Sequence, residues 1–176
     1  MRHRERSLPG NFSNSETVMA ARKCLVVFYS WSGTTRKVAQ ALAAELRCDC
    51  EEIVETRARR GFLAYTRSIH EAAQRRPAPI APTKHNPSSY DLVIVGTPVW
   101  AWSVSSPVRA YLAANAQSLP QVAFFCTFGG RGEKRTFAQM QAICGKPPIG
   151  TIGFFARDVL SGQFLTRLKA FAASLF

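Results

Sequence analysis

Three largely apolar runs, separated by segments with helical spacing, dominate the pattern of hydrophobic and polar residues. The runs occupy residues 24–29, 90–96 and 121–126, and each leads directly into a loop of small, hydroxyl-bearing or aromatic residues. Strands that are covered on both faces of a parallel sheet read as continuous apolar runs rather than as alternating ones. The pattern therefore predicts an α/β protein whose parallel sheet has helices on both faces.

The same spacing predicts strands and helices in alternation. Strands are expected near 24–29, 50–55, 91–96, 121–126 and 149–155, and helices near 34–47, 61–75, 105–116, 134–144 and 161–174. Prolines between residues 77 and 87 indicate an irregular connection. Residues 1–22 are polar and lack periodicity, so we expect a flexible N-terminal tail followed by a single domain over residues 23–176.

The loop after the first strand, residues 30–35 (the first loop), has the composition of an anion site. It contains Ser30, Trp31, Ser32, Gly33, Thr34 and Thr35 and opens the helix expected at 34–47. The first N–H groups of a helix have no internal partner and attract an anion, and Gly33 lets the backbone come close. This chemistry suits a terminal phosphate. The alternative is a serine or threonine N-cap on a surface helix.

Two further loops follow the next two apolar runs. The second loop contains Thr97, Pro98, Val99, Trp100, Ala101 and Trp102, and the third contains Thr127, Phe128, Gly129 and Gly130. In open α/β sheets, ligands bind beyond the carboxyl ends of the strands at a switch point. A phosphate loop, an aromatic loop and a glycine loop would together surround a flat aromatic phosphate ester. Core packing of the tryptophans and ordinary glycine turns are the alternatives.

In these three loops and their order, the chain resembles the flavodoxin family from Lys23 to Phe176. The resemblance implies a doubly wound, five-stranded parallel sheet in a three-layer sandwich, with strand order 2-1-3-4-5. It also implies that FMN is the cofactor, with its phosphate on the first loop and its ring between Trp100 and the Gly129-Gly130 turn. Trp31 is expected to shield the first loop.

The expected function is that of an FMN-dependent oxidoreductase that passes electrons from NAD(P)H to a quinone-like or other small acceptor. The sequence has no Gly-x-Ser-x-Gly elbow, no paired-carboxylate constellation and no metal motif, so bound flavin is expected to carry the chemistry. One alternative is a one-electron carrier that docks to an acidic redox protein. Another is a flavin-free, basic interaction domain.

Ala101 bears on the choice between enzyme and carrier. Family members typically have glycine after the ring-contacting aromatic, and its peptide turns on flavin reduction. The Cβ of Ala101 makes a positive φ costlier, so we expect this turned peptide to be less accessible here. This favours two-electron chemistry, and with it the enzyme.

Composition, net charge and cysteine content indicate the cellular compartment and the kinds of partner. The 176 residues carry a net charge of +12, and no apolar run approaches the roughly 20 residues that span a bilayer. Five cysteines without a repeated Cys-x-x-Cys spacing indicate reduced thiols and a cytoplasmic protein. Cys48-Asp49-Cys50 places two thiols on one side of an extended segment. A basic segment at residues 57–76 is expected to attract anions such as NAD(P)H, an acidic redox protein or an anionic surface. The alternative is that these charges are simply solvated. No motif indicates specific nucleic-acid binding.

Overall fold

The computed structural model describes residues 22–56 and 78–176, and five parallel strands form its sheet. In spatial order they are β2 (Asp49–Glu52), β1 (Cys24–Phe28), β3 (Leu92–Trp100), β5 (Gln121–Phe128) and β6 (Thr151–Phe155). This order confirms the predicted sheet. A short strand, β4 (Ser103–Val104), pairs antiparallel with the end of β3 and was not predicted.

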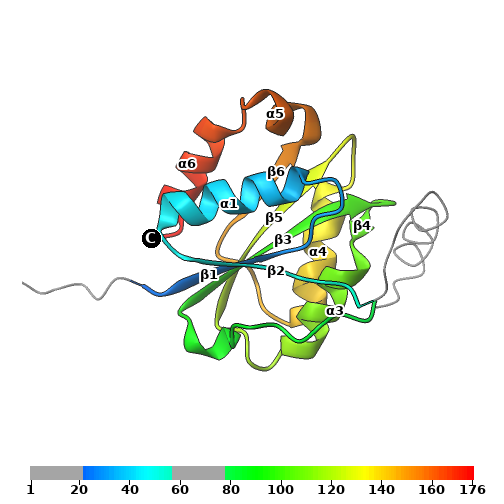
Figure 1. Cartoon of the computed structure of the whole chain (residues 1–176), viewed down its shortest axis with the longest axis vertical. Coiled ribbons are helices and arrows are strands. Elements are labelled where there is room, and N and C mark those ends of the chain that lie inside the picture. Colours follow the sequence, from blue (N-terminus) through cyan, green and yellow to red (C-terminus); the bar gives the residue numbers. More distant parts are fainter. Residues whose placement is uncertain (1–21, 57–77) are drawn as a thin grey trace, which may run out of the picture.

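Helices cover both faces of the sheet (Figure 1). On one face lie α1 (Thr34–Leu46), α5 (Ala156–Ser161) and α6 (Leu165–Ser174). On the other lie α3 (Ser106–Asn115) and α4 (Glu133–Cys144). None of the described helices is long and apolar enough to cross a membrane.

Alternation along the strands explains why the apolar runs are continuous. In β1, Val26 and Phe28 join the core under α1 and α6, whereas Leu25 and Val27 join the core under α3 and α4. Successive side chains of a strand point to opposite faces, so a strand in the middle of the sandwich must be apolar throughout.

Three predicted boundaries are wrong. Strand β3 extends to Trp100, because residues expected to form the second loop continue the strand and pair with β4. Strand β2 is only Asp49–Glu52. The helix predicted at 161–174 begins only at Leu165, as α6, and the helix α5 before it, which was not predicted, ends where Gly162 adopts a φ of 82°. The helix predicted at 61–75, the whole basic segment 57–76 and residues 1–21 of the predicted tail lie outside the described residues.

Residues 78–86 run back along the edge strand β2 and its continuation. Ala81 N–H donates to Val54 O at 2.8 Å, and Thr56 N–H donates to Pro79 O at 3.1 Å. The buried Glu51 carboxylate accepts from the backbone N–H groups of Lys84 (2.5 Å) and His85 (3.0 Å), and lies 3.1 Å from His85 Nδ1. These contacts cover the sheet edge, which would otherwise present unpaired backbone groups.

Candidate functional site

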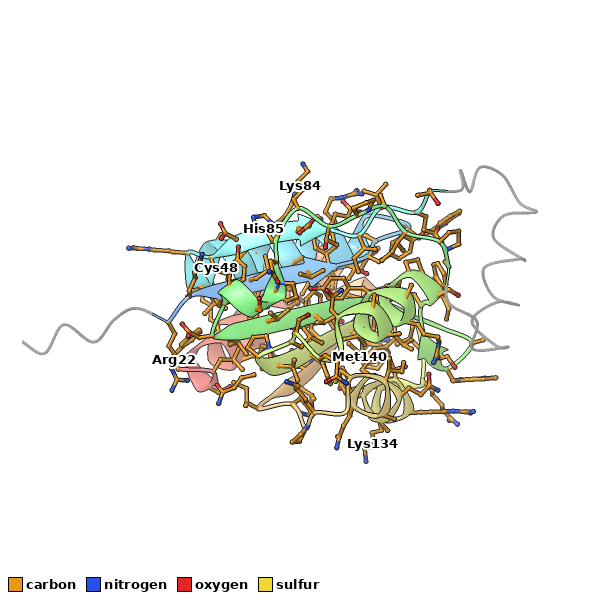
Figure 2. The ribbon with its side chains drawn as sticks, turned by 90° about the horizontal axis from the view of Figure 1, so that it is seen from below. Arg22, Cys48, Lys84, His85, Lys134 and Met140 are labelled. Atoms are coloured by element: carbon orange, nitrogen blue, oxygen red, sulfur yellow. The ribbon has the colours of Figure 1, made fainter. Side chains whose placement is uncertain are left out.

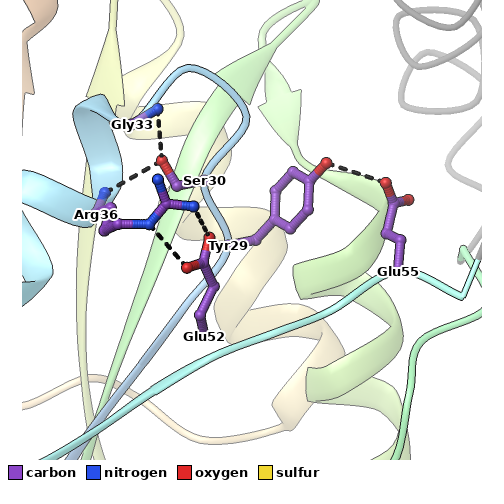
Figure 3. A network of polar contacts seen from close by, with 6 residues as sticks. All are labelled: Tyr29, Ser30, Gly33, Arg36, Glu52 and Glu55. Carbon is purple, nitrogen blue, oxygen red and sulfur yellow. Dashed lines mark hydrogen bonds and ion pairs between the residues drawn. The ribbon is translucent and has the colours of Figure 1, made fainter. Parts of the chain in front are cut away.

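The first loop is held in shape by one buried hydroxyl. Ser30 Oγ accepts hydrogen bonds from the backbone N–H groups of Gly33 (3.1 Å) and Arg36 (3.2 Å), as Figure 3 shows. Gly33, the residue before α1, adopts a φ of 89°, a conformation that side chains with a Cβ rarely take. The sequence Ser-x-x-Gly therefore makes a tight turn that leads directly into the helix.

The start of α1 offers hydrogen-bond donors to the space above it. No side chain caps the helix, and its first bond runs from Lys37 N–H to Gly33 O at 3.0 Å. The N–H groups of Thr34 and Thr35 thus have no partner within the helix. The exposed hydroxyls of Ser32 and Thr34 lie 3.1 Å apart at the same turn. A Cβ built on Gly33 would meet only Arg36 Nη1, at 3.8 Å, so the space over the turn is open. Such a turn is suited to hold an anion.

A cation stands beside the first loop. The Arg36 guanidinium binds the Glu52 carboxylate through two hydrogen bonds of 2.8 and 2.7 Å (Figure 3). This hydrogen bonding and the charge of Glu52 raise the pKa of Arg36 above its ordinary value. The sequence analysis missed both residues. Their pairing depends on the β1–β2 register, which sets Phe28 opposite Glu52.

The second loop is the tip of the β3–β4 hairpin. Trp100 pairs with Ser103, so Ala101 and Trp102 form a two-residue connection, with φ values of 46° and 57°. Positive φ at both central residues defines a type I′ turn, which usually contains Asn and Gly. Ala101 thus adopts the positive φ that its Cβ was expected to make costly. The strand pairing imposes a conformation that costs a residue with a Cβ about 1–2 kcal/mol.

The strained turn gives a first prediction. Ala101→Gly is expected to raise the free energy of unfolding by about 0.5–1 kcal/mol, because removing Cβ relieves more strain than the added unfolded-state entropy costs. Ala101→Val is expected to lower it. Urea unfolding of both variants measures the two effects, and an Ala101→Gly variant less stable than the parent would contradict a strained turn.

Aromatic rings connect the first loop to the hairpin. The Trp100 ring packs edge-on against Tyr29 (centroids 5.5 Å apart) and Trp31 (6.4 Å). Trp31 is 37% exposed and Trp102 is 59% exposed, which is unusual for large apolar side chains. Tyr29 Oη donates to Glu55 Oε2 at 3.0 Å on the far side (Figure 3). The two predicted loops therefore share one aromatic wall.

The side chain of Gln139 on α4 holds the β3–β4 hairpin in place through hydrogen bonds. Its Oε1 accepts from Val104 N–H (3.2 Å) and Arg109 Nη2 (3.1 Å), and its Nε2 donates to Ser103 Oγ (3.2 Å). Gln139 is a site-positioning residue that the sequence pattern did not reveal, because its partners are distant in the chain.

Removing this side chain tests its role. Gln139→Ala is expected to cost about 2–3 kcal/mol of stability, because three hydrogen bonds in a mostly buried region are lost. Gln141→Ala, the same change at an exposed position of the same helix, is the matched control and is expected to change stability by less than about 0.5 kcal/mol. Urea unfolding compares the two, and similar losses would show that Gln139 holds nothing in place.

The third loop meets the first through a buried pair of hydroxyls. Thr127 Oγ1 lies 2.8 Å from Thr35 Oγ1, which joins the end of β5 to the first turn of α1. A Cβ built on Gly129 or Gly130 would meet nothing within 4 Å, so this backbone is open to approach. Gly132 (φ 117°) packs on the hairpin, because a Cβ there would lie 2.9 Å from Trp102 Cα. The predicted loops thus assemble at the carboxyl ends of β1, β3 and β5.

A cationic hollow adjoins the third loop. Its volume is about 430 Å³, and the aromatic pair Phe128 and Phe155 (centroids 4.6 Å apart) lies in its wall. Arg131, Lys134 and Arg135 line it together with Glu133. Within the parts of the chain that the structure describes, no group of three or more histidine, cysteine or acidic side chains is arranged to hold a metal ion.

Comparisons with known proteins agree with this architecture. A family model described as flavodoxin matches residues 23–152. The chain is similar to a flavoprotein from Lactobacillus acidophilus solved in complex with FMN (22% identity, 81% of this chain and 97% of that one, TM-score 0.67). It is also similar to a putative flavoprotein from Bacteroides uniformis (18%, 85% and 96%, TM-score 0.70). Two-electron reduced flavodoxin from Megasphaera elsdenii is a third (17%, 87% and 99%, TM-score 0.51). No curated protein matches the chain.

Proposed function

Because the chain belongs to the flavodoxin family, we propose that it is an oxidoreductase that binds FMN at the carboxyl ends of β1, β3 and β5. The observation that carries the proposal is the uncapped start of α1 behind Gly33, where amide and hydroxyl donors face open space. The solved complex of the Lactobacillus acidophilus flavoprotein with FMN supports the choice of ligand.

The residues present fit the phosphate end of this ligand. The N–H groups of Thr34 and Thr35 and the hydroxyls of Ser32 and Thr34 would hold the phosphate, while Ser30 keeps the turn in shape from below. Arg36 adds positive potential next to the turn, although Glu52 offsets much of its charge. Neutral donors and a helix start bind a phosphate ester without a fully charged pocket.

The remaining predicted residues fit the flavin ring. Trp100, Ala101 and Trp102 would border one side of the ring, and Gly129 and Gly130 would present backbone to its edge. Bound flavin would supply the hydride or electron transfer. The chain's own part is to bind and orient the ring, and the wall of Tyr29, Trp31 and Trp100 would limit its contact with water.

For the electron donor we propose NAD(P)H, with a quinone-like or other small molecule as acceptor. Arg131, Lys134 and Arg135 support this choice, because they surround a hollow beside the third loop in which the phosphates of a nicotinamide dinucleotide would find opposite charge. The alternative partner is an acidic redox protein, which the same cations would attract.

Two measurements on the purified full-length chain test the proposal. Released cofactor is first identified by chromatography and mass, and FMN is the expected result. The FMN-loaded protein is then mixed anaerobically with NADPH and with NADH, and flavin absorbance near 450 nm is expected to bleach with at least one of them. A chain that binds no flavin would refute the whole proposal. FMN binding without reduction by either nucleotide would refute the nicotinamide donor and favour the carrier.

A further inference from the structure

Two cysteines lie side by side where the chain enters the sheet. The parallel register of β1 and β2 pairs Leu25 with Asp49, so one residue earlier on each strand Cys24 stands beside Cys48. Neighbouring strands are about 4.7–4.9 Å apart, and disulfides join Cα atoms about 4.4–6.8 Å apart. The backbone thus brings these two residues within disulfide range.

The two side chains also share a face of the sheet. Cys24 is 4% exposed in the core under α1, and the half-buried Cys48 packs against that same core. Cys48 sits just after the α1 cap, where its N–H donates to Ala43 O at 3.0 Å, and so precedes the first ladder pair of β2. The interaction between the two thiols lowers the pKa of Cys24 and, together with burial, raises that of Cys48.

A small reagent can reach this pair. Both cysteines line a hollow of about 350 Å³ together with Arg22, Lys23 and Arg47. Cys48 and Arg22 lie at the same end of the molecule in Figure 2. Positive charge around a thiol favours the thiolate, the form that reacts, and Asp49 is the acidic residue facing the same hollow.

We propose that Cys24 and Cys48 are a redox-active dithiol that hydrogen peroxide oxidises to a disulfide. The Cys24 thiolate attacks one peroxide oxygen, the O–O bond breaks, and the departing hydroxide takes a proton to leave as water. The Cys48 thiol then attacks the resulting sulfenic sulfur, the S–O bond breaks, and a second water leaves. The two thiols lose two electrons and two protons, and the peroxide gains them.

The disulfide would link the start of β1 to the end of α1 and would close a loop that contains the whole first loop. Cross-linking a loop of this length is expected to raise the melting temperature by about 5–10 °C. Because the pair lies at the opposite end of β1 from the first loop, the inference is independent of flavin binding.

Peptide mapping of the full-length chain tests this. After hydrogen peroxide treatment and alkylation of free thiols, trypsin is expected to yield residues 24–36 disulfide-linked to residues 48–57, a product that dithiothreitol reverses. Titratable thiols are expected to fall from five to three, since one disulfide consumes two. The melting temperature is expected to rise by about 5–10 °C.

Matched variants distinguish a Cys24–Cys48 disulfide from one that involves Cys50. Cys50→Ser removes the neighbouring thiol on β2, whose pKa partial desolvation and the charge of Glu52 raise to about 11, and it is expected to leave the linkage intact. Cys48→Ser is expected to abolish both the linkage and the rise in melting temperature. The inference is overturned if all five thiols stay free, if Cys50 forms the disulfide instead, or if Cys48→Ser loses as many thiols as the parent.

Discussion

The chain is expected to bind FMN about a thousandfold more tightly than riboflavin, because riboflavin lacks the phosphate that the start of α1 would hold. Three hydrogen bonds to a charged group at about 1.5 kcal/mol each account for a factor of this size. Fluorescence titration of the flavin-free chain with each ligand measures the ratio. Equal affinities would mean that the uncapped turn at Gly33 does not bind the phosphate.

Gly33→Val locates this effect in the first loop. The branched side chain would occupy the open space over the turn and strain a backbone at φ 89°, so FMN affinity is expected to fall at least a hundredfold while riboflavin affinity changes little. Gly162→Val is the matched control. Gly162 has nearly the same backbone conformation (φ 82°, ψ −1°, against 89° and −12°) and open space around it, but it ends α5. Both variants are expected to lose about 1–2 kcal/mol of stability, and only Gly33→Val to lose the preference for FMN.

Gly96→Ala is expected to destabilise the fold by about 3 kcal/mol, because the added methyl group would overpack the core. A Cβ on Gly96 would lie 2.0 Å from the Phe125 ring, on the neighbouring strand β5. Phe125 is fully buried in the core under α1 and cannot swing outward. We expect the melting temperature to fall by roughly 6–12 °C in thermal unfolding.

Two further variants test the cause. Gly130→Ala adds the same methyl group where nothing lies within 4 Å, and is expected to change the melting temperature by no more than about 2 °C. Phe125→Leu combined with Gly96→Ala is expected to recover part of the loss, because the smaller side chain leaves room for the Cβ. A Gly96→Ala variant as stable as the Gly130→Ala variant would refute the clash.

The parallel sheet could be predicted, because buried parallel strands leave an apolar signature, and its strand order was implied by the resemblance to flavodoxins. The meeting of three loops at one edge follows, because ligands bind at the carboxyl ends of the strands in such sheets. The β3–β4 hairpin could not be predicted. Thr97 and Pro98 resemble the start of a loop, and Ala101-Trp102 lacks the Asn-Gly signal of a type I′ turn. Cross-strand pairing decided the conformation there, against local preference.

Other features were missed because they depend on the register between strands. Periodicity assigns side chains to a face but does not say which residues of two strands stand opposite each other. Arg36 contacts Glu52 only because β1 and β2 pair in one particular alignment. The same alignment places Cys24 beside Cys48, whereas the sequence alone had suggested only Cys50 as a neighbour of Cys48. Gln139 likewise reaches the hairpin from a helix more than 30 positions along the chain.

The return of residues 78–86 along β2 brings the two ends of the segment 57–77 together. Thr56 and Pro79 are hydrogen bonded, and Glu55 and Ile80 form a bridge, so residues 57–77 leave and re-enter the body at adjoining points. The contacts of the sheet edge therefore hold the residues on either side of positions 57–77 next to each other. Doubling the length of such an insertion costs only about 0.6 kcal/mol of closure entropy. A short Gly-Ser turn in place of residues 57–77 is therefore expected to leave the Glu51 contacts and the sheet in place.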